Sequence, residues 1–462
     1  MNSQKDPAAT LDPDKGLPWY RGLTRYHWFV LIVCWMAWTF DTFDQQIFNL
    51  CRMPALTDLL GRPVDSVLKS YSGMVTMIMM FGWATGGIVF GILGDKWGRA
   101  KTMLLAIMFY SIFTGMSSFS TSWVDFTAYR FLTGLGVGGT FGAAVSFVAD
   151  VLPGRSRPFA LGTLQALAAV GNMTAALISM VLIRPSVEMW SGVLGWRVLF
   201  GVGIIPAILA LLVMRKIKEP ESWVKAKEAE KRGEGLHKGR GMGSVRELFG
   251  DPRWRKNAIV GITLGLAGII GLWGIGFWQA DLTREVVKGK DADFYAGLSM
   301  FLFNGSAAIG TYLFAWLMSK IGRRPAFALI FILAIVSVTV VFGFMSKPSH
   351  IWWMSPLLGL GTLTIFGGYS IYFPELFPTR LRATGVGFCY NTARYLAAFG
   401  PLTLGLLSGF YGGMHTKIGI LGSLGGVDSG FRYAALTVSI VFVVGLVALL
   451  FAPETKDKPL PE

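Results

Sequence analysis

Apolar runs of about 20 residues recur along the whole chain and are separated mostly by short polar breaks. A helix of that length crosses the hydrocarbon core of a bilayer, which is roughly 30 Å thick. Helices are expected because backbone groups in lipid must form their hydrogen bonds within the segment. The pattern predicts twelve spans, at residues 27–50, 70–94, 102–120, 124–151, 159–183, 196–214, 257–281, 294–318, 326–345, 351–375, 386–410 and 430–451.

One long polar stretch, residues 215–256, divides six predicted spans from six. Its mixed charges fit a solvated linker with a short amphipathic helix on the membrane surface, and a regulatory docking site is the alternative. We therefore expect an all-α membrane protein with two six-helix bundles and two cytoplasmic tails. The predicted parts are a tail at 1–26, bundles at 27–214 and 257–451, the linker at 215–256 and a tail at 452–462.

The charge of the chain indicates its orientation. Lys and Arg outnumber Asp and Glu by 42 to 27, which gives a formal net charge of +15. The basic residues gather in alternate loops, so membrane topology explains them better than nucleic-acid binding. By the positive-inside rule these loops, the linker and both termini are cytoplasmic, and we expect a monomer in a bacterial inner membrane.

The sequence lacks the residue patterns that several classes of chemistry require. The three cysteines, Cys34, Cys51 and Cys389, form no CxxC pair, so neither a disulfide framework nor a metal cluster is expected. No GxxxxGK[ST] loop or nucleophile-base motif occurs, which argues against ATP drive, an enzyme or a cofactor. Residues 134–139 spell GxGxxG, but they lie within a span without a preceding strand, so close helix packing explains these glycines better than a dinucleotide site.

The two halves share a motif. GILGDKWGRAK at 91–101 follows span two, and AWLMSKIGRRP at 315–325 follows span eight. Duplicated halves are typical of secondary transporters, which hold the substrate at the midplane between two bundles. Asp95 has Ser319 as its counterpart, so we expect the contacts of the two motifs to be asymmetric.

The pattern GxLxDxxGRxK in 91–101, together with RFLTGLGVGG on span four and the six-plus-six layout, resembles the major facilitator superfamily. The resemblance implies two pseudo-symmetric bundles that work by alternating access. Further segments resemble the branch of aromatic acid and other metabolite:proton symporters, sugar porters and organic ion transporters: DTFD, DVLPGRSRPFALG, KEPESW, PELFPTRLRATGVGF and PETKDKPLP. Aromatic acid symporters usually carry a glycine where this chain has Thr42.

Charges inside the spans are candidates for function because a carboxylate in hydrocarbon costs at least about 2.5 to 3.5 kcal/mol. Asp41 and Asp44 share one face of span one, and Arg130 lies at a similar depth on span four. The resemblance makes spans one and four neighbours, which implies that Asp44 and Arg130 pair and couple a proton. Asp41 is the secondary candidate, and a permanent structural ion pair is the alternative.

Arg394 and Asn391 share a face of span eleven, with Arg394 about 15 Å from the cytoplasmic start. The planar guanidinium matches a carboxylate, so Arg394 is the candidate anchor for an organic anion, with Glu375 or a backbone carbonyl as the alternative partner. Other polar and aromatic residues could line the cavity or simply pack between helices: Gln165, Asn172, Trp278, Gln279, Asn304, Tyr369 and Tyr372.

A third group of charged residues lies at the predicted cytoplasmic ends of the spans. Salt bridges there would hold the two bundles together while the outer side is open. Positive-inside topology alone would not explain the acidic members. The candidate gate consists of Asp95, Arg99, Lys101, Asp150, Arg157, Arg323, Glu375, Arg380 and Arg382.

These features predict a secondary transporter whose partners are a small-molecule substrate, protons and the lipid bilayer. We expect proton-coupled symport of a small organic anion, either a monocarboxylate or an aromatic acid. Sugar or polyol uptake, efflux of drugs or metabolites by proton antiport, and a non-transporting membrane receptor remain open alternatives.

Overall fold

The computed structural model describes residues 18–61, 64–182, 188–189, 193–214, 216–232, 241–272, 275, 278–288, 292–399, 407, 410–411 and 429–461. Within these residues the chain is almost wholly helical. The exception is one antiparallel pair of two-residue strands, β1 (Glu188–Met189) and β2 (Val193–Leu194). The prediction of an all-α membrane fold is confirmed.

The described residues of the first half form eight helices, because two of the predicted spans are divided. Span five becomes α5 and α6, which meet at Leu167, and span six becomes α7 and α8. The helices are α1 (Arg25–Leu59), α2 (Asp65–Trp97), α3 (Arg99–Ser117), α4 (Trp123–Val151), α5 (Arg157–Ala166), α6 (Ala168–Leu182), α7 (Gly195–Val202) and α8 (Ile205–Met214). Two short helices, α9 (Glu221–Arg232) and α10 (Val245–Gly250), lie in the linker.

The second half repeats this plan with different breaks. Predicted span ten divides into α15 and α16, and span twelve into α19 and α20. The elements are α11 (Pro252–Gly271), α12 (Trp278–Val287), α13 (Ala292–Ile321), α14 (Arg323–Phe344), η3 (Pro348–His350), α15 (Ile351–Thr362), α16 (Ile365–Glu375), η4 (Thr379–Leu381), α17 (Arg382–Ala397), α19 (Ser429–Val438) and α20 (Val441–Phe451).

Eight stretches of the described chain are long and apolar enough to cross a membrane. They coincide with predicted spans two, three, four, six, eight, nine, ten and twelve. The other four predicted spans fall on α1, on α5 and α6, on α11 and α12, and on α17, which carry more polar residues or run into parts outside the described residues. The count of twelve spans therefore stays a prediction.

Local sequence explains where the helices begin. Ser122 caps α4 by accepting from the Asp125 N–H, and the Asp125 carboxylate accepts in return from the Ser122 N–H at 2.9 Å, so both free donors are satisfied. Gly98 and Gly322 separate α2 from α3 and α13 from α14, with φ of 120° and 97°. A side chain disfavours those angles, so glycine permits the sharp turn in both copies of the repeated motif.

Glycines also bring α4 close to its neighbours. A Cβ atom at Gly134 would lie 2.3 Å from the Met79 carbonyl oxygen of α2, and one at Gly136 would lie 2.5 Å from the Tyr110 nitrogen of α3. The GxGxxG segment therefore packs helices against each other, as its place within a span predicts.

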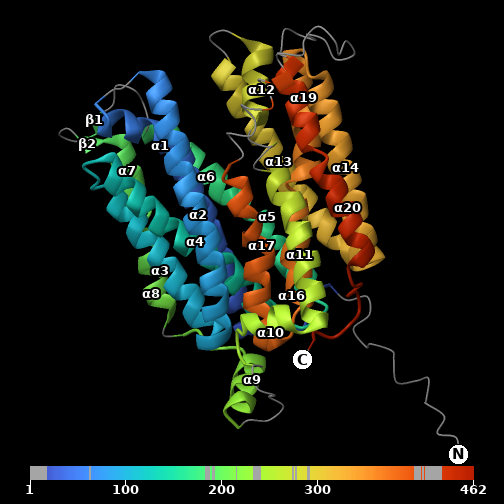
Figure 1. Cartoon of the computed structure of the whole chain (residues 1–462). Helices are drawn as coiled ribbons and strands as arrows, with labels where there is room; N and C mark the ends of the chain where they lie inside the picture. Colours follow the sequence, from blue (N-terminus) through green and yellow to red (C-terminus); the bar gives the residue numbers. More distant parts are fainter. Residues whose placement is uncertain are drawn as a thin grey trace, which may run out of the picture.

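The two halves stand side by side in Figure 1 and come together at the end that carries α9, α10 and the C-terminus. Two helices cross between them. A Cβ at Gly162 of α5 would lie 2.7 Å from the Ala315 Cβ of α13, and one at Gly387 of α17 would lie 2.4 Å from the Gly87 carbonyl oxygen of α2. Each half thus sends one helix against the other half.

Candidate functional site

A cavity of about 100 Å³ lies between the two halves. One wall comes from α1, α2, α5 and α6, and the facing wall from α13, α16, α17 and the residues that follow α11 and α15. The lining residues are Trp38, Thr42, Gln45, Trp83, Gln165, Ala166, Ala168, Ala169, Asn172, Leu272, Asn304, Ala307, Ala308, Thr311, Leu363, Phe366, Tyr390 and Arg394. This composition combines one cation with amides, hydroxyls and aromatic rings.

Arg394 supplies the positive charge of the cavity. Its guanidinium carbon lies 4.2 Å from the centre of the Trp83 ring and 4.4 Å from that of Tyr390, so it contacts an aromatic ring from each half. Nη1 donates to the Tyr390 carbonyl at 2.6 Å and to Asn391 Oδ1 at 3.0 Å. Nε has no hydrogen-bond partner within the described chain. The group is held in place, yet part of its bonding capacity is free.

Asn391 positions Arg394 and does not line the cavity. Its amide packs against Gly87 of α2, where a Cβ would lie 2.0 Å from the Asn391 Cγ. The shared face that the sequence predicts for Asn391 and Arg394 therefore yields a direct contact, with Asn391 facing the neighbouring helix. Gly87 has no side chain, so the Asn391 amide fits against its backbone.

Three amides of the predicted set line the cavity together with Arg394. Gln165 is 8% exposed, and its Oε1 has no hydrogen-bond partner in the residues that the structure describes. Asn304 donates to the Met300 carbonyl at 2.8 Å, and Asn172 lies on α6. Gln165 thus has an acceptor available to a ligand.

Four other residues of the predicted set lie outside this cavity in this conformation, which agrees with the alternative of packing between helices. Tyr369 stacks on Phe373 at 4.7 Å and donates to the Leu264 carbonyl, deep within the second half. Tyr372 donates to the Pro453 carbonyl at 2.6 Å. Trp278 contacts Phe431, and Gln279 is fully buried beside it. Packing within one bundle is the physical reason, because helical spacing alone does not distinguish the cavity face from the bundle core.

Sequence reasoning missed most of the aromatic lining. Trp38, Trp83, Phe366 and Tyr390 all border the cavity. Helical spacing could have found one of them, because Tyr390 precedes Arg394 by four residues and therefore lies on the same face. The same rule points to Gln45, which follows Asp41 by four residues and donates to its carboxylate at 3.2 Å.

The predicted proton-coupling residues are fully buried near this cavity. Asp44 accepts from the Thr114 hydroxyl at 2.5 Å, and Arg130 donates to the Ser117 hydroxyl at 2.6 Å, so α3 supplies the partner of each. Asp44 and Arg130 attract each other electrostatically, but no direct ion pair between them occurs in the described chain. The predicted direct pair is thus absent from this conformation. Instead, two different residues of α3 bind them: Thr114 binds Asp44, and Ser117 binds Arg130.

Asp41, unlike Asp44, interacts with residues that line the central cavity. The Arg394 guanidinium attracts its carboxylate, and cavity residue Gln45 donates to its Oδ2. Its Oδ1 is buried and has no hydrogen-bond partner among the described residues. Asp41 therefore interacts electrostatically with both Arg394 and Asp44.

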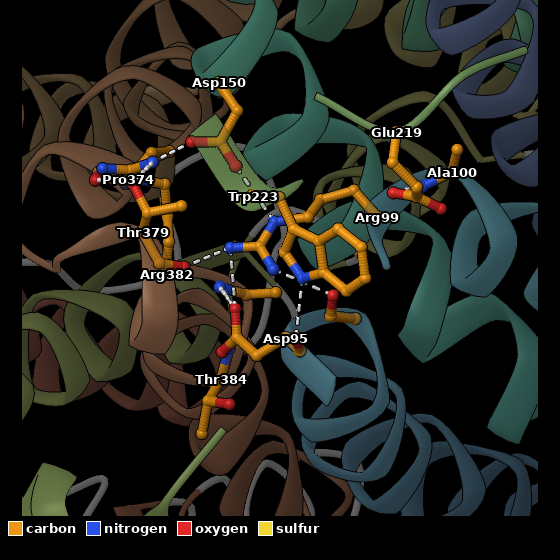
Figure 2. A network of polar contacts seen from close by, with 12 residues as sticks. Asp95, Arg99, Ala100, Asp150, Glu219, Trp223, Pro374, Thr379, Arg382 and Thr384 are labelled. Carbon is orange, nitrogen blue, oxygen red and sulfur yellow. Dashed lines mark hydrogen bonds and ion pairs between the residues drawn. The ribbon is translucent and has the colours of Figure 1, made fainter. Parts of the chain in front are cut away.

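A network of buried charges joins the halves at the end near α9 (Figure 2). The Asp150 carboxylate accepts from Arg99 Nε at 2.9 Å within the first half and from Arg382 Nη1 of the second half. Arg99 also donates to the Thr379 carbonyl of the second half. All three charged side chains are 0% exposed, so breaking this arrangement would leave buried charges unpaired.

Asp95 adds a second bridge between the halves. Its carboxylate pairs with Arg99 at 2.9 Å and accepts from the N–H groups of Ala383 and Thr384 at 3.1 and 2.8 Å. These are the first free donors of α17, so an acid of the first half caps a helix of the second. Figure 2 shows Asp95 facing Thr384 beneath the arginines.

The matching residues of the second half stay within that half. Arg323 pairs with Glu375 at 2.6 Å, and Glu375 also accepts from the Thr455 hydroxyl. Ser319, the counterpart of Asp95, donates to the Trp316 carbonyl of its own helix. The contacts of the two motifs are therefore asymmetric, as the difference between Asp95 and Ser319 predicts.

The remaining members of the predicted gate have other partners. Arg380 pairs with Glu247 of the linker at 2.8 Å, and Arg157 donates through Nε to the Leu152 carbonyl at 2.8 Å. The Lys101 backbone N–H donates to Glu219 at 3.0 Å. The network between the halves thus consists of Asp95, Arg99, Asp150 and Arg382, and the other residues surround it.

Two glutamates that sequence reasoning missed cap the helices after the repeated motif. Glu219 accepts from the N–H groups of Ala100 and Lys101, at 3.1 and 3.0 Å. Glu454 accepts from those of Arg323 and Arg324, at 2.9 and 3.0 Å. Burial raises the pKa of the Glu454 carboxyl. The backbone N–H groups of Arg323, Arg324, Thr455 and Lys456 outweigh burial and hold this pKa below its ordinary value. The adjacent prolines in KEPESW and PETKDK were the available signal.

The linker contacts this network directly. Trp223 of α9 donates to the Asp95 carbonyl at 2.7 Å, and the Gly243 N–H donates to the Arg380 carbonyl at 2.8 Å. No residue of α9 is buried, which agrees with a solvated helix. The predicted linker therefore reaches both halves at the end where they meet.

Comparison with known proteins places this architecture in one family. The family described as the Major Facilitator Superfamily matches residues 53–401. The cis,cis-muconate transport protein of Acinetobacter baylyi is 29% identical, over 87% of this chain and 91% of its own length. The probable 4-methylmuconolactone transporter of Cupriavidus pinatubonensis is 27% identical over 88% of each chain.

A solved structure shows the same fold. The proton:xylose symporter XylE bound to 6-bromo-6-deoxy-D-glucose aligns with a TM-score of 0.72 and 17% identity, covering 94% of this chain and 98% of its own. The family matches most of the chain, and this agrees with the two helical halves and the cavity between them. The protein is thus an integral membrane transporter and not an enzyme, and it belongs to the major facilitator superfamily.

Proposed function

We propose that this protein takes up a small organic anion together with protons, across a bacterial inner membrane with both termini in the cytoplasm. The observation that carries the proposal is the position of Arg394 in the cavity between the halves. A guanidinium with a free donor binds a carboxylate better than a sugar hydroxyl, because the bond is assisted by charge. The substrate is therefore a monocarboxylate or a related acid.

The rest of the cavity supports an apolar or unsaturated body on this acid. Trp38, Trp83, Phe366 and Tyr390 offer ring surface around Arg394, while Gln165 offers an acceptor. A hydrophobic lining with a few polar groups is typical of pockets for small organic ligands. Two bacterial relatives are named as transporters of cis,cis-muconate, an unsaturated dicarboxylate, and of 4-methylmuconolactone, which supports an unsaturated organic acid.

Proton coupling is proposed for Asp44 and Arg130, with Asp41 in support. Asp44 has one buried oxygen without a hydrogen-bond partner in the described chain, and Arg130 has one such nitrogen. A proton on Asp44 would remove its attraction for Arg130, so exchange of that proton would change how α1 and α4 interact through α3. Charges inside a membrane protein commonly mark such a pathway.

Alternating access is proposed to use the network of Asp95, Arg99, Asp150 and Arg382 as the cytoplasmic gate. These contacts hold α2, α3 and α4 to α17 at the end near the linker. Opening of that end would require them to separate while the halves rock as rigid bodies.

Uptake into proteoliposomes tests the proposal. With an inward proton gradient, labelled benzoate should accumulate, and labelled xylose should not. Asp44→Asn should abolish accumulation driven by the gradient while retaining exchange at equal concentrations, because substrate binding at Arg394 is left intact. Gradient-driven accumulation that survives in Asp44→Asn would exclude Asp44 as the coupling residue, and uptake of xylose alone would refute the choice of an acid.

A further inference from the structure

A second arginine lies on α1 beyond the central cavity. Arg52 follows Gln45 by two turns, about 10 Å along the helix. Its Nη1 donates to the Thr76 hydroxyl of α2 at 3.1 Å. Its Nε is buried without a hydrogen-bond partner in the described chain, and none of the ion pairs found there includes it. Arg52 is therefore a half-buried cation with one donor that no described residue of the protein accepts.

A small cavity lies beside the central cavity and is bordered by Thr76, the residue that Arg52 contacts. It has a volume of about 10 Å³ and is lined by Gln45, Phe48, Asn49, Thr76, Met79, Met80 and Trp83. Gln45 and Trp83 also line the central cavity, and Thr76 is the residue that accepts from Arg52. The two cavities thus share a wall, and Arg52 lies at the far end from Arg394.

The nearest acidic group of the opposite half does not neutralise Arg52. Asp281 of α12 attracts Arg52 electrostatically, but its carboxylate pairs with Arg284 at 3.0 Å and its side chain is 56% exposed. A charge that is partly removed from water is stabilised by an anion with hydrogen-bonding oxygens. The Asn49 amide lies on the same cavity and carries N–H groups suited to such oxygens. The Thr76 hydroxyl donates to the Ser72 carbonyl at 2.8 Å and accepts from Arg52, so it positions Arg52.

We propose that Arg52, positioned by Thr76, and Asn49 form an outer anion site, which holds the carboxylate of the substrate before it reaches Arg394. The proposal rests on uptake of an organic anion, as argued above. The small cavity has space for about one water molecule, so a carboxylate passes only when Trp83 or Gln45 moves. Trp83 also contacts Arg394 at 4.2 Å, so occupation of the inner site and closure of this passage involve one side chain.

The outer site can be tested without knowledge of the substrate. The measured quantity is the ratio of the rates at which a cysteine introduced at position 49 reacts with an anionic and with a cationic reagent. The background carries Asn49→Cys and alanine in place of Cys34, Cys51 and Cys389, which are buried. The full-length protein is reconstituted and treated from outside with a sulfonate-bearing or a trimethylammonium-bearing methanethiosulfonate. We expect the anionic reagent to react faster, and Arg52→Gln to lower the ratio of the two rates about tenfold, from one charge at about 6 Å in water.

Two further variants separate a site from a general surface charge. Arg52→Lys keeps the charge and should keep the ratio within about threefold, which also shows that position 52 tolerates change. Arg197→Gln removes an arginine that pairs with Asp58 near the end of α1 and lines neither cavity, so it should leave the ratio unchanged. An equal fall in both glutamine variants, no fall in Arg52→Gln, or no reaction with either reagent would overturn the outer site.

Transport of benzoate gives an independent measure. Arg52→Gln should raise the KM of uptake about tenfold with kcat changed less than threefold, and Arg52→Lys should recover most of the KM. An unchanged KM would show that the site does not serve the substrate. If the unsubstituted protein takes up no acid, the proposed function fails, and the thiol measurement still decides whether the outer anion site exists.

Discussion

Replacing Asp150 by asparagine tests whether the buried network keeps the cytoplasmic end closed. Asp150 binds Arg99 of its own half and Arg382 of the other, and all three side chains are shielded from water. Breaking a buried ion pair costs about 3 to 5 kcal/mol, because the remaining charge stays buried. Arg99 keeps Asp95 as a partner, so the lower value applies. A loss of about 3 kcal/mol, at 1.4 kcal/mol per tenfold, raises the ratio of open to closed protein about 100-fold.

The assay measures access to the central cavity from the cytoplasmic side. Ala166 lines that cavity, so Ala166→Cys in a background without native cysteines reports on opening of the cytoplasmic end. A membrane-impermeant thiol reagent on that side should react about 100-fold faster in Asp150→Asn. Glu375→Gln is the matched control, since Glu375 pairs with Arg323 within its own half. Equal acceleration by both variants would refute the reasoning.

Three other predictions concern the capping glutamate, the helix packing and the anion anchor. The lowered pKa of Glu454 means that its contribution to stability is present above its unfolded pKa of about 4.3 and is lost as pH falls through the folded value. Glu454→Gln should therefore lower Tm at pH 7, and this difference from the native protein should shrink toward pH 3; a constant difference would contradict the cap. Gly138→Ala should lower stability by at least about 1 to 3 kcal/mol, because its Cβ would lie 2.1 Å from the Trp83 carbonyl oxygen, whereas Gly73→Ala, with open space around it, should not destabilise in the same thermal scan. Arg394→Lys keeps the charge but loses the planar fork, so counterflow of the transported acid should show a KM at least about tenfold higher, and an unchanged KM would remove Arg394 as the anchor.

The sequence was sufficient to predict the helical fold and the residues with buried charge. Asp44, Arg130 and Arg394 are conspicuous because charge is rare in apolar runs, and all three are buried. The direct pair of Asp44 and Arg130 could not be judged this way. It depends on the small polar atoms of Thr114 and Ser117 on a third helix, whose positions no spacing rule supplies.

Aromatic and amide residues were harder to assign. Tyr369 and Tyr390 both lie in apolar spans, but Tyr369 packs inside one bundle while Tyr390 faces the cavity. Which face of a helix meets the other half depends on the rotation of whole bundles. Asp150 and Glu375 both precede a PxRxR segment, so their sequence surroundings are similar. Asp150 nevertheless binds an arginine of the other half, whereas Glu375 binds one of its own half, because the two bundles are placed asymmetrically.

Helix α17 carries both ends of the proposed machinery on one short rod. Arg382 and the capped N–H groups of Ala383 and Thr384 form its first turn, and Arg394 lies about 18 Å further along. A ligand that shifts Arg394 therefore pulls on the same backbone that Asp95 and Asp150 hold. Under the proposed function, a change at the central cavity would reach the network between the halves along the backbone of α17, without a chain of intermediate side chains. Mutations that soften this rod would separate substrate affinity from turnover even if every charged group were kept.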